Sequence, residues 1–537
     1  MKIFRKHPIY LIIILILTVC SSASSVYAGY SLGLLYESLE QTSFQLLFRN
    51  SFFIISIWIL SIAINYILDC MIAYTLKVIN VDIRKTYTHD ISNLKYRDYT
   101  RNNTGYYISR LTNDIERFDE SALLSIFSLM GNMLKMLFSF IAITSMHSYL
   151  AYFTIASTFI MLIIPNITKP IIGKYSNNVS NRQEAFVGIL NETFSNYIVF
   201  KTNNLMKKFR DRINNESNNL EQDKLKFQFI KDLIMRINSA INILFQIGTL
   251  MFTVYLVINN AVYPGAILSI ANLVGVFFSS SLGVFNDIVT YNSSKPITNK
   301  LSEFDWLNEQ DYNTASVALT DQIQSIKSEK LSFNYDENMS IFNDINLTFE
   351  FPNKYVIIGE SGSGKSTLLK CIAGLYESYS GKIFYNNFPL KELNLPDVWN
   401  QVVYLDQTST LFTGTIKENL TLGEEYSEEE IIEVLERVNA YNFVYSNDEG
   451  LDYMVTEGGK NFSGGQKQRL AIARGLLRKP RILLIDEATS ALDERNKKLI
   501  ESTILQDPEL MVIMISHNIN QDTEAYIDKI IQLDDIQ

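Results

Sequence analysis

The first 300 or so residues of the chain contain long apolar runs, and the remaining residues are richer in charge. A helix needs about 20 consecutive apolar residues to cross a bilayer. Six runs meet or approach that length. Very short connections join the third run to the fourth and the fifth run to the sixth. This pattern predicts an all-α, six-helix transmembrane domain over residues 1–300. The expected spans are Ile9–Ala28, Ser51–Tyr74, Ser121–Met146, Tyr149–Ile167, Asn238–Ile258 and Val262–Thr290.

Two long polar connections, Thr75–Glu120 and Thr168–Ile237, carry many lysines and arginines, whereas the short connections carry almost none. Positive charge is retained on the cytoplasmic side of a membrane. We therefore expect both long connections and both chain termini in the cytoplasm, in a multi-pass protein of the bacterial plasma membrane. The long connections are expected to be helical extensions of the spans.

The N-terminal run has an alternative interpretation. Basic residues precede it, and small residues end it near Val26-Tyr27-Ala28, which is also the pattern of a cleaved signal peptide. Its length through Ala28 favours a retained span.

Lys135 falls near the middle of the third expected span. A lysine there costs about 2.5–3.5 kcal/mol on insertion scales, so it is expected to face a cavity or a partner. One hypothesis makes it a contact for an anionic group on a substrate. The favoured alternative pairs it with a carboxylate such as Asp287 or places it in a water-filled vestibule.

After a polar linker predicted over residues 301–325, the chain reads as a soluble domain over residues 326–537. The apolar run Tyr355–Ile358 predicts a strand that feeds a glycine-rich turn and then a helix, Lys365–Ala373. This is the context of a phosphate-binding P-loop, in which backbone N–H groups point at phosphate oxygens. Lys365 can reach the β- and γ-phosphates, and the Ser366 hydroxyl can hold Mg²⁺. The loop consists of Gly359, Glu360, Ser361, Gly362, Ser363, Gly364, Lys365, Ser366 and Thr367.

A second motif lies about a hundred residues later, Phe462-Ser463-Gly464-Gly465-Gln466. It narrows the broad class of nucleotide-binding proteins to one family. Together the two motifs resemble the nucleotide-binding domain of ATP-binding-cassette (ABC) transporters. The whole chain resembles an exporter-type half-transporter. That resemblance implies an α/β P-loop NTPase, the ABC ATPase domain, behind the six-helix domain, with ATP and Mg²⁺ as ligands.

The resemblance also implies roles for single residues. Tyr335 would stack on adenine, Gln407 and Asp486 would help hold Mg²⁺, Glu487 would polarise the attacking water, and His517 would lie near the γ-phosphate. The signature loop would bind the nucleotide of a second subunit, and Asp493 would communicate across the dimer. The signature-loop residues are Ser463, Gly464, Gly465 and Gln466. Two positions depart from the family pattern: Asp406 replaces a proline, and Phe462 replaces a leucine.

Three further stretches are similar to family elements that link the two domains. Thr104–Asp114 resembles the first cytoplasmic loop, where a short coupling helix meets the ATPase, and Glu184–Lys201 resembles the second. Thr456–Gly459 resembles the exporter-specific loop that touches these coupling helices.

Composition excludes several other classes. A net charge of −10 argues against a nucleic-acid partner, because phosphate backbones are bound by clustered cations. The three cysteines, Cys20, Cys70 and Cys371, are far apart and have no zinc-site spacing.

The sequence thus predicts an ATP hydrolase coupled to export, working by alternating access as a dimer in the lipid bilayer. A homodimer is favoured because no site residue is degenerate, and a heterodimer is the alternative. The substrate is expected to be a peptide, a hydrophobic drug or a lipid. No peptidase domain is expected ahead of the spans, so this chain is not expected to process a double-glycine leader. Two rivals remain: an exporter-fold importer of siderophore type, and a nucleotide-gated regulator that does not pump.

Overall fold

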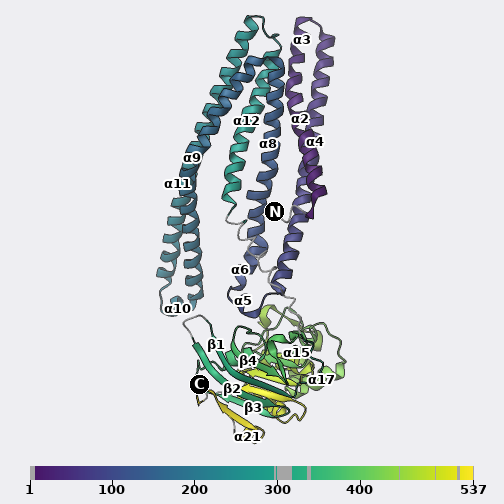
Figure 1. Cartoon of the computed structure of the whole chain (residues 1–537), viewed down its shortest axis with the longest axis vertical. Coiled ribbons are helices and arrows are strands. Elements are labelled where there is room, and N and C mark those ends of the chain that lie inside the picture. The colour runs from purple at the N-terminus through teal and green to yellow at the C-terminus, as the bar shows by residue number, and fades with distance from the viewer. Residues whose placement is uncertain are drawn as a thin grey trace. The chain divides into compact units, whose positions relative to one another are not determined.

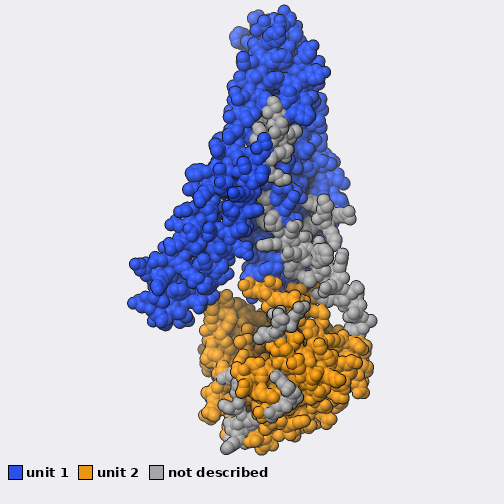
Figure 2. Space-filling view, turned by 60° about the vertical axis from the view of Figure 1, so that its left-hand side comes forward, with its two compact units in different colours: residues 1–92, 104–308 blue, residues 93–103, 309–537 orange. Residues whose placement is uncertain are grey.

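The computed structural model divides the chain into two compact units: residues 1–92 with 104–308, and residues 93–103 with 309–537 (Figure 2). It describes residues 6–295, 298, 317–335, 340–446, 448–489, 491–516 and 521–535. Within these ranges the side chains of 160–166, 169, 293, 521, 522 and 535 are not described. His517 and residues 301–316 of the predicted linker lie outside the described residues.

Long helices form the first unit (Figure 1). α4, α9 and α11 contain 49, 48 and 53 residues. At about 1.5 Å per residue they far exceed the ~30 Å hydrocarbon core, so each continues well beyond a membrane span. The predicted helical extensions are therefore confirmed. The helices are α2 (Pro8–Tyr30), α3 (Leu34–Glu40), α4 (Phe44–Ser92), α6 (Thr104–Ser109), α7 (Ile115–Phe118), α8 (Leu124–Met146), α9 (Ser148–Ser195), α10 (Tyr197–Thr202), α11 (Met206–Ile258) and α12 (Ala266–Ser293).

Five of the described helical stretches are long and apolar enough to cross a membrane. They contain the first, second, third and fifth expected spans, and the stretch Ala266–Asn292 covers all but the first four residues of the sixth. The fourth expected span, Tyr149–Ile167, lies on α9, where the side chains of 160–166 are outside the description. It stays a prediction. His147 alone separates α8 from α9, as the pattern indicated.

The helices of this unit pack in pairs: α2 along α4, α8 along α12, and α9 along α11 (Figure 1). α2 also contacts α8. Val26, Ile143 and Phe278 belong to one apolar cluster that joins these elements. Within the spans, small polar side chains bond across helices, as where Ser21 Oγ donates to Asn65 Oδ1 at 2.7 Å. Such bonds satisfy polar groups where water is excluded.

Before α8 the chain is wound as two π-helical segments, Arg110–Asp114 and Asp119–Leu123. Arg110 is buried, and its guanidinium donates to the Tyr87 hydroxyl at 2.9 Å and lies 4.4 Å from the centre of the Tyr106 ring. The segment that resembles the first cytoplasmic loop is thus anchored within the helical unit. The short helix that packs with the ATPase is α5 (Tyr96–Thr100), directly upstream of the expected Thr104–Asp114.

The second unit contains a parallel sheet of five strands, ordered β11-β3-β10-β9-β6, and an antiparallel sheet ordered β2-β1-β4-β5. The predicted α/β class is confirmed. The strands are β1 (Ser325–Asn334), β2 (Ser340–Glu350), β3 (Lys354–Ile358), β4 (Ser380–Tyr385), β5 (Phe388–Pro389), β6 (Val402–Leu405), β7 (Gly414–Thr415), β8 (Met454–Val455), β9 (Ile482–Asp486), β10 (Met511–Ile515) and β11 (Lys529–Gln532). The helices are α14 (Lys365–Ile372), α15 (Leu395–Trp399), α16 (Ile416–Thr421), α17 (Glu428–Arg437), α18 (Tyr441–Tyr445), α19 (Gly464–Leu477), α20 (Glu494–Leu505) and α21 (Gln521–Glu524).

Each central strand of the parallel sheet feeds two apolar cores. On β9, Ile482 and Leu484 belong to one core, and Leu483 and Ile485 belong to the other. Successive side chains of a strand point to opposite faces, so a continuous apolar run is required when both faces are covered. This explains why the strands that carry the site read as unbroken apolar runs.

The folded ATPase unit starts earlier than residue 326. Leu319 and Ile323 are buried in its core, and Val317 forms a bridge with Leu393. The C-terminal part of the predicted linker, residues 317–325, therefore packs with the ATPase unit. The linker prediction was wrong there because two spaced apolar residues are too weak a pattern to reveal burial.

Candidate functional site

Three sequence-predicted segments meet at one edge of the parallel sheet. The P-loop follows β3. Asp486 is the last residue of β9, and Glu487 comes directly after it. Gln407 lies two residues past β6. β3, β10, β9 and β6 are parallel neighbours. Ligands of such sheets bind beyond the carboxyl ends of the strands, so the topology gathers these residues into one site.

Gly364 shows why this loop requires glycine. Its φ is +89°, in the left-handed region, and it precedes α14. A Cβ at this position would stand 2.6 Å from Ile341 Cγ2. Only glycine adopts this conformation and this approach without strain. The turn directs the first N–H groups of α14 outward, where a helix N-terminus favours phosphate.

Lys365 is 5% exposed, and its ammonium group lies over the P-loop backbone. Nζ donates to the main-chain oxygens of Gly359 at 2.8 Å and Glu360 at 2.6 Å. Asp534 Oδ2 accepts a hydrogen bond from the Glu360 N–H at 2.9 Å. Two charged side chains thus hold the backbone of the loop.

Asp486 is 2% exposed, and both of its carboxylate oxygens are bonded. Ser366 Oγ donates to Oδ1 at 2.8 Å, and the Tyr404 hydroxyl donates to Oδ2 at 2.8 Å. Burial raises the pKa of Tyr404, and the adjacent Asp486 carboxylate raises it further. Tyr404 therefore remains a neutral donor and fixes the orientation of the carboxylate.

The donor set fits Mg²⁺. This cation prefers oxygen ligands, is held by one or two protein groups, and takes the rest from phosphates and water. Ser366 and Asp486 present oxygens 2.8 Å from one another, and Gln407, two residues past the neighbouring strand β6, could add an amide oxygen. Among the described residues, no group of three or more His, Cys, Asp or Glu forms a self-contained metal cluster.

Glu487 contacts Gln407 directly. Gln407 Nε2 donates to Glu487 Oε2 at 2.9 Å. The φ of Glu487 is +51°, a left-handed conformation that is uncommon for a residue with a side chain. Such strain occurs at functional sites, where the surrounding structure maintains it. The two residues that the sequence placed 80 positions apart are therefore brought together.

Tyr335 directly follows β1 and lies next to the P-loop helix. Its hydroxyl is 3.0 Å from Thr367 Oγ1, and its ring meets the Phe333 ring edge-on at 5.1 Å. The residue is 37% exposed. A half-exposed aromatic ring beside a phosphate-binding loop is suited to stacking on a base.

The signature loop caps α19. Ser463 Oγ accepts from the Gln466 N–H, and Gln466 Oε1 accepts from the Ser463 N–H, in a capping box. Gly465 approaches Ala491: a Cβ on it would lie 3.4 Å from the Ala491 oxygen. Asp493 caps α20, accepting from the Asn496 N–H at 3.0 Å, and hydrogen bonds from Asn496 lower the pKa of Asp493. Both predicted dimer-facing residues, Ser463 and Asp493, thus stabilise helix starts.

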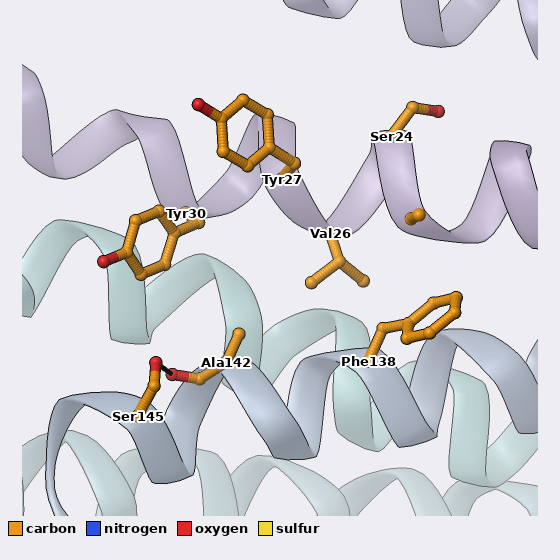
Figure 3. Close-up of a pocket in the computed structure, with 8 residues that line it drawn as sticks. Ser24, Val26, Tyr27, Tyr30, Phe138, Ala142 and Ser145 are labelled. Carbon is orange, nitrogen blue, oxygen red and sulfur yellow. Dashed lines mark hydrogen bonds between the residues drawn. The ribbon is translucent and has the colours of Figure 1, made fainter.

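The helical unit holds a second feature, an apolar hollow of about 540 Å³ between α2 and α8. Val26 points from α2 toward Phe138 and Ala142 on α8 (Figure 3). No charged residue is among its lining side chains, which also include Ala23, Ser24, Tyr27, Tyr30 and Ser145.

Lys135 lies on α8, one turn before the hollow. The predicted pairing with Asp287 is not observed, because no ion pair involves Lys135 in the described part of the chain. Asp287 instead accepts a hydrogen bond from Asn132 Nδ2 at 2.9 Å.

Comparison with known proteins identifies the class. The family model of the ABC transporter transmembrane region matches residues 11–281, half of the chain, and the ABC transporter model matches residues 342–490. The chain belongs to the ABC transporters and has the exporter-type arrangement, with both parts in one polypeptide. Because the first match begins at residue 11, the first span is part of the family's membrane region.

Individual relatives fit this class. The chain is 28% identical to the Microcin-J25 export ATP-binding/permease protein McjD of Escherichia coli, over 82% of this chain and 75% of the relative. It is 28% identical to a putative multidrug export ATP-binding/permease protein of Staphylococcus aureus, over 88% and 82%.

A third relative is the sublancin-168-processing and transport ATP-binding protein SunT of Bacillus subtilis. It is 34% identical over 60% of this chain, and the matched region spans 45% of SunT. The fold is similar to that of a bacterial Atm1-family ABC exporter with ATP bound. The TM-score is 0.83 at 18% identity, over 98% of this chain and 93% of the other.

Sequence reasoning missed Tyr404, Asp534 and Arg97, which contact predicted site residues. Tyr404 carries a weak signal, since it interrupts the apolar strand Val402–Leu405 directly before the Gln407 turn. Asp534 and Arg97 reach the site from distant positions, and no local pattern marks them.

Proposed function

We propose that the chain is one half of an ATP-driven exporter that works by alternating access as a dimer. The observation that carries this proposal is the pair of hydrogen bonds Ser366–Asp486 and Gln407–Glu487. The first joins the P-loop to Asp486, the last residue of β9. The second joins Glu487, the residue after β9, to Gln407, which follows β6. Phosphate binding, metal binding and water activation would share one site.

Each residue would perform a separate task at that site. Lys365 and the loop N–H groups bind and orient the phosphates of ATP. Mg²⁺, held by Ser366, Asp486 and Gln407, would neutralise phosphate charge when bound. Glu487 accepts a proton from the attacking water, a role worth roughly 10²–10⁴ in rate. His517, which lies outside the described residues, would contact the γ-phosphate.

A dimer is part of the proposal because the signature loop of this family binds the nucleotide of the other subunit. Ser463 and the N–H groups that begin α19 present a helix N-terminus suited to a phosphate. All the site residues are present in this chain, which supports a homodimer over a heterodimer. Closure around two ATP molecules would open the membrane cavity, and hydrolysis would reset it, with both termini on the cytoplasmic side of the bacterial plasma membrane.

One feature of the membrane unit supports the proposed substrate class. The uncharged, aromatic hollow between α2 and α8 suits an apolar segment of a peptide, a hydrophobic drug or a lipid chain. The names of the relatives refer to microcin-J25 export, sublancin-168 processing and transport, and multidrug export, which supports export over uptake.

The Glu487→Gln variant tests the ATPase assignment. We expect hydrolysis to fall by about 10²–10⁴ while ATP still binds, because only the proton acceptor is removed. An exposed glutamate of α17, Glu429, offers a matched control, since Glu429→Gln leaves the site intact. Normal turnover in Glu487→Gln would refute the assigned role.

Two experiments distinguish the rival functions. Transport measured in inside-out vesicles and in intact cells separates export from the uptake expected of an importer. A substrate panel on the reconstituted protein, scored by vanadate-sensitive hydrolysis, separates a pump from a nucleotide-gated regulator. Negligible hydrolysis by purified protein would favour the regulator.

A further inference from the structure

A short segment from the membrane half of the sequence is folded together with the ATPase. Residues 93–103 belong to the same compact unit as residues 309–537, and α5 lies within them. Lys95 Nζ reaches Glu377 Oε2 at 2.5 Å, but both side chains are substantially exposed. Exposed pairs of this kind contribute little to stability. The next residues of the segment, Tyr96 and Arg97, contact residues that adjoin or include Tyr335.

Arg97 binds the backbone of the predicted adenine-stacking residue. Its Nη2 donates a hydrogen bond to the main-chain oxygen of Tyr335, and its Nη1 donates to Ser378 Oγ. β1 ends at Asn334, so no ladder of that strand supports the Tyr335 carbonyl. The guanidinium is planar and rigid, and it fixes two acceptors at once. It thereby fixes the backbone position from which the Tyr335 ring projects.

Tyr96 adds a second contact through an aromatic chain. Its ring lies 5.7 Å from that of Tyr376. The Tyr376 ring stacks at 5.2 Å on Phe333 and meets the Tyr335 ring edge-on at 6.0 Å. Tyr376 is 7% exposed. Because interiors are close-packed, displacing Tyr96 would shift Tyr376 and with it the support of the Tyr335 ring.

We propose that Arg97 and Tyr96 are positioning residues for adenine binding, acting through Tyr335. Residues 93–103, which lie in the polar connection between the second and third expected spans, would then support the base-binding site, and ATP affinity would depend on them through Tyr335. This inference rests on the proposed function, because it takes Tyr335 as the residue that stacks on the base. It assigns Arg97 no contact with ATP itself.

The test compares a ligand that has a base with one that lacks it. Dissociation constants of Mg²⁺–ADP and Mg²⁺–pyrophosphate are measured on the full-length protein in lipid nanodiscs, and neither ligand is hydrolysed. Loss of a charged hydrogen bond at Tyr335 is expected to weaken ADP binding about tenfold in Arg97→Ala, with pyrophosphate binding unchanged. Arg97→Lys, which keeps one donor, should recover part of the ADP affinity.

Lys95→Ala is the matched control, since it removes the neighbouring cation of the same segment, whose partner is Glu377. Its ADP affinity should stay within about twofold of the starting protein. Tyr96→Leu tests the aromatic path in a variant that keeps apolar packing, and it should weaken ADP but not pyrophosphate binding.

Unchanged ADP affinity in Arg97→Ala and Tyr96→Leu would overturn the inference, and so would equal losses for both ligands. Either result would leave the ATPase assignment standing. Absence of ADP binding by the unsubstituted protein would instead overturn the proposed function.

Discussion

The Ser366 hydroxyl donates a hydrogen bond to Oδ1 of Asp486 at 2.8 Å, across 120 positions of sequence. It connects the second residue of α14 to the last residue of β9. The contact exists because β9 and β3 flank β10 in one parallel sheet, so their carboxyl ends lie at the same edge. A metal ion at this point would lie between the phosphate-binding loop and the buried carboxylate.

The Asp486→Asn substitution should remove most of the effect of Mg²⁺ on ATP hydrolysis and on ADP affinity. The amide keeps the size of the side chain but removes the charge that the cation needs. We expect hydrolysis to fall about a hundredfold, and ADP affinity to become nearly equal with Mg²⁺ and with EDTA. Titration calorimetry with both buffers measures this. Asp452→Asn, at an exposed position, should retain the Mg²⁺ dependence, and a persistent dependence in Asp486→Asn would contradict the metal role.

Two glycine substitutions should separate backbone strain from steric clash. Gly364 and Gly423 have φ of +89° and +90°, but only at Gly364 would a Cβ meet another side chain closely. Gly423→Ala should cost about 1–2 kcal/mol, the usual cost of the left-handed conformation. Gly364→Ala should cost more and abolish ATP binding. Thermal unfolding measures the loss of stability, and a nucleotide-binding assay measures the loss of ATP binding. Equal stability and equal ATP binding in the two variants would contradict a steric clash at Gly364.

Ser463 should show two separable functions. Ser463→Ala removes the cap of α19 and should lower the stability by about 1 kcal/mol. It should also lower the rate of ATP hydrolysis. Ser463→Asn keeps a capping side chain and should restore stability but not hydrolysis, because the hydroxyl is absent. Unfolding curves and ATPase rates on the same preparations provide the comparison. Full activity in Ser463→Asn would mean that the serine acts only as a cap.

Cys371 should be chemically inert in the folded protein. Burial raises the pKa of its thiol to about 12, so the thiolate is scarce at pH 8. The raised pKa also means that the thiol supports stability below its ordinary pKa of 9.0, and that this contribution declines as pH rises toward about 12. In a Cys20→Ser, Cys70→Ser background, maleimide labelling at pH 8 should be negligible until denaturant is added. Rapid labelling of the native protein would contradict the burial of Cys371.

The sequence predicted much of the fold because the relevant signals are local. An apolar run such as Val262–Thr290 predicts a span without reference to its neighbours, and the structure has α12 there. The strand–loop–helix context of Gly359–Thr367 likewise depends on successive residues only. The start of the ATPase unit was misplaced because Leu319 and Ile323 are isolated apolar residues whose burial depends on distant elements.

By itself, then, the sequence determined the class of the chain, five of its apolar helices and the positions of the glycine-rich and acidic segments, because short-range periodicity and motif spacing encode them. Only the tertiary structure decided which residues support that site. Tyr404 reaches Asp486 across 82 positions, Asp534 reaches Glu360 across 174, and Arg97 reaches Tyr335 across 238. Such contacts follow from strand order and from the packing of buried surfaces, which bring together residues that no local pattern relates.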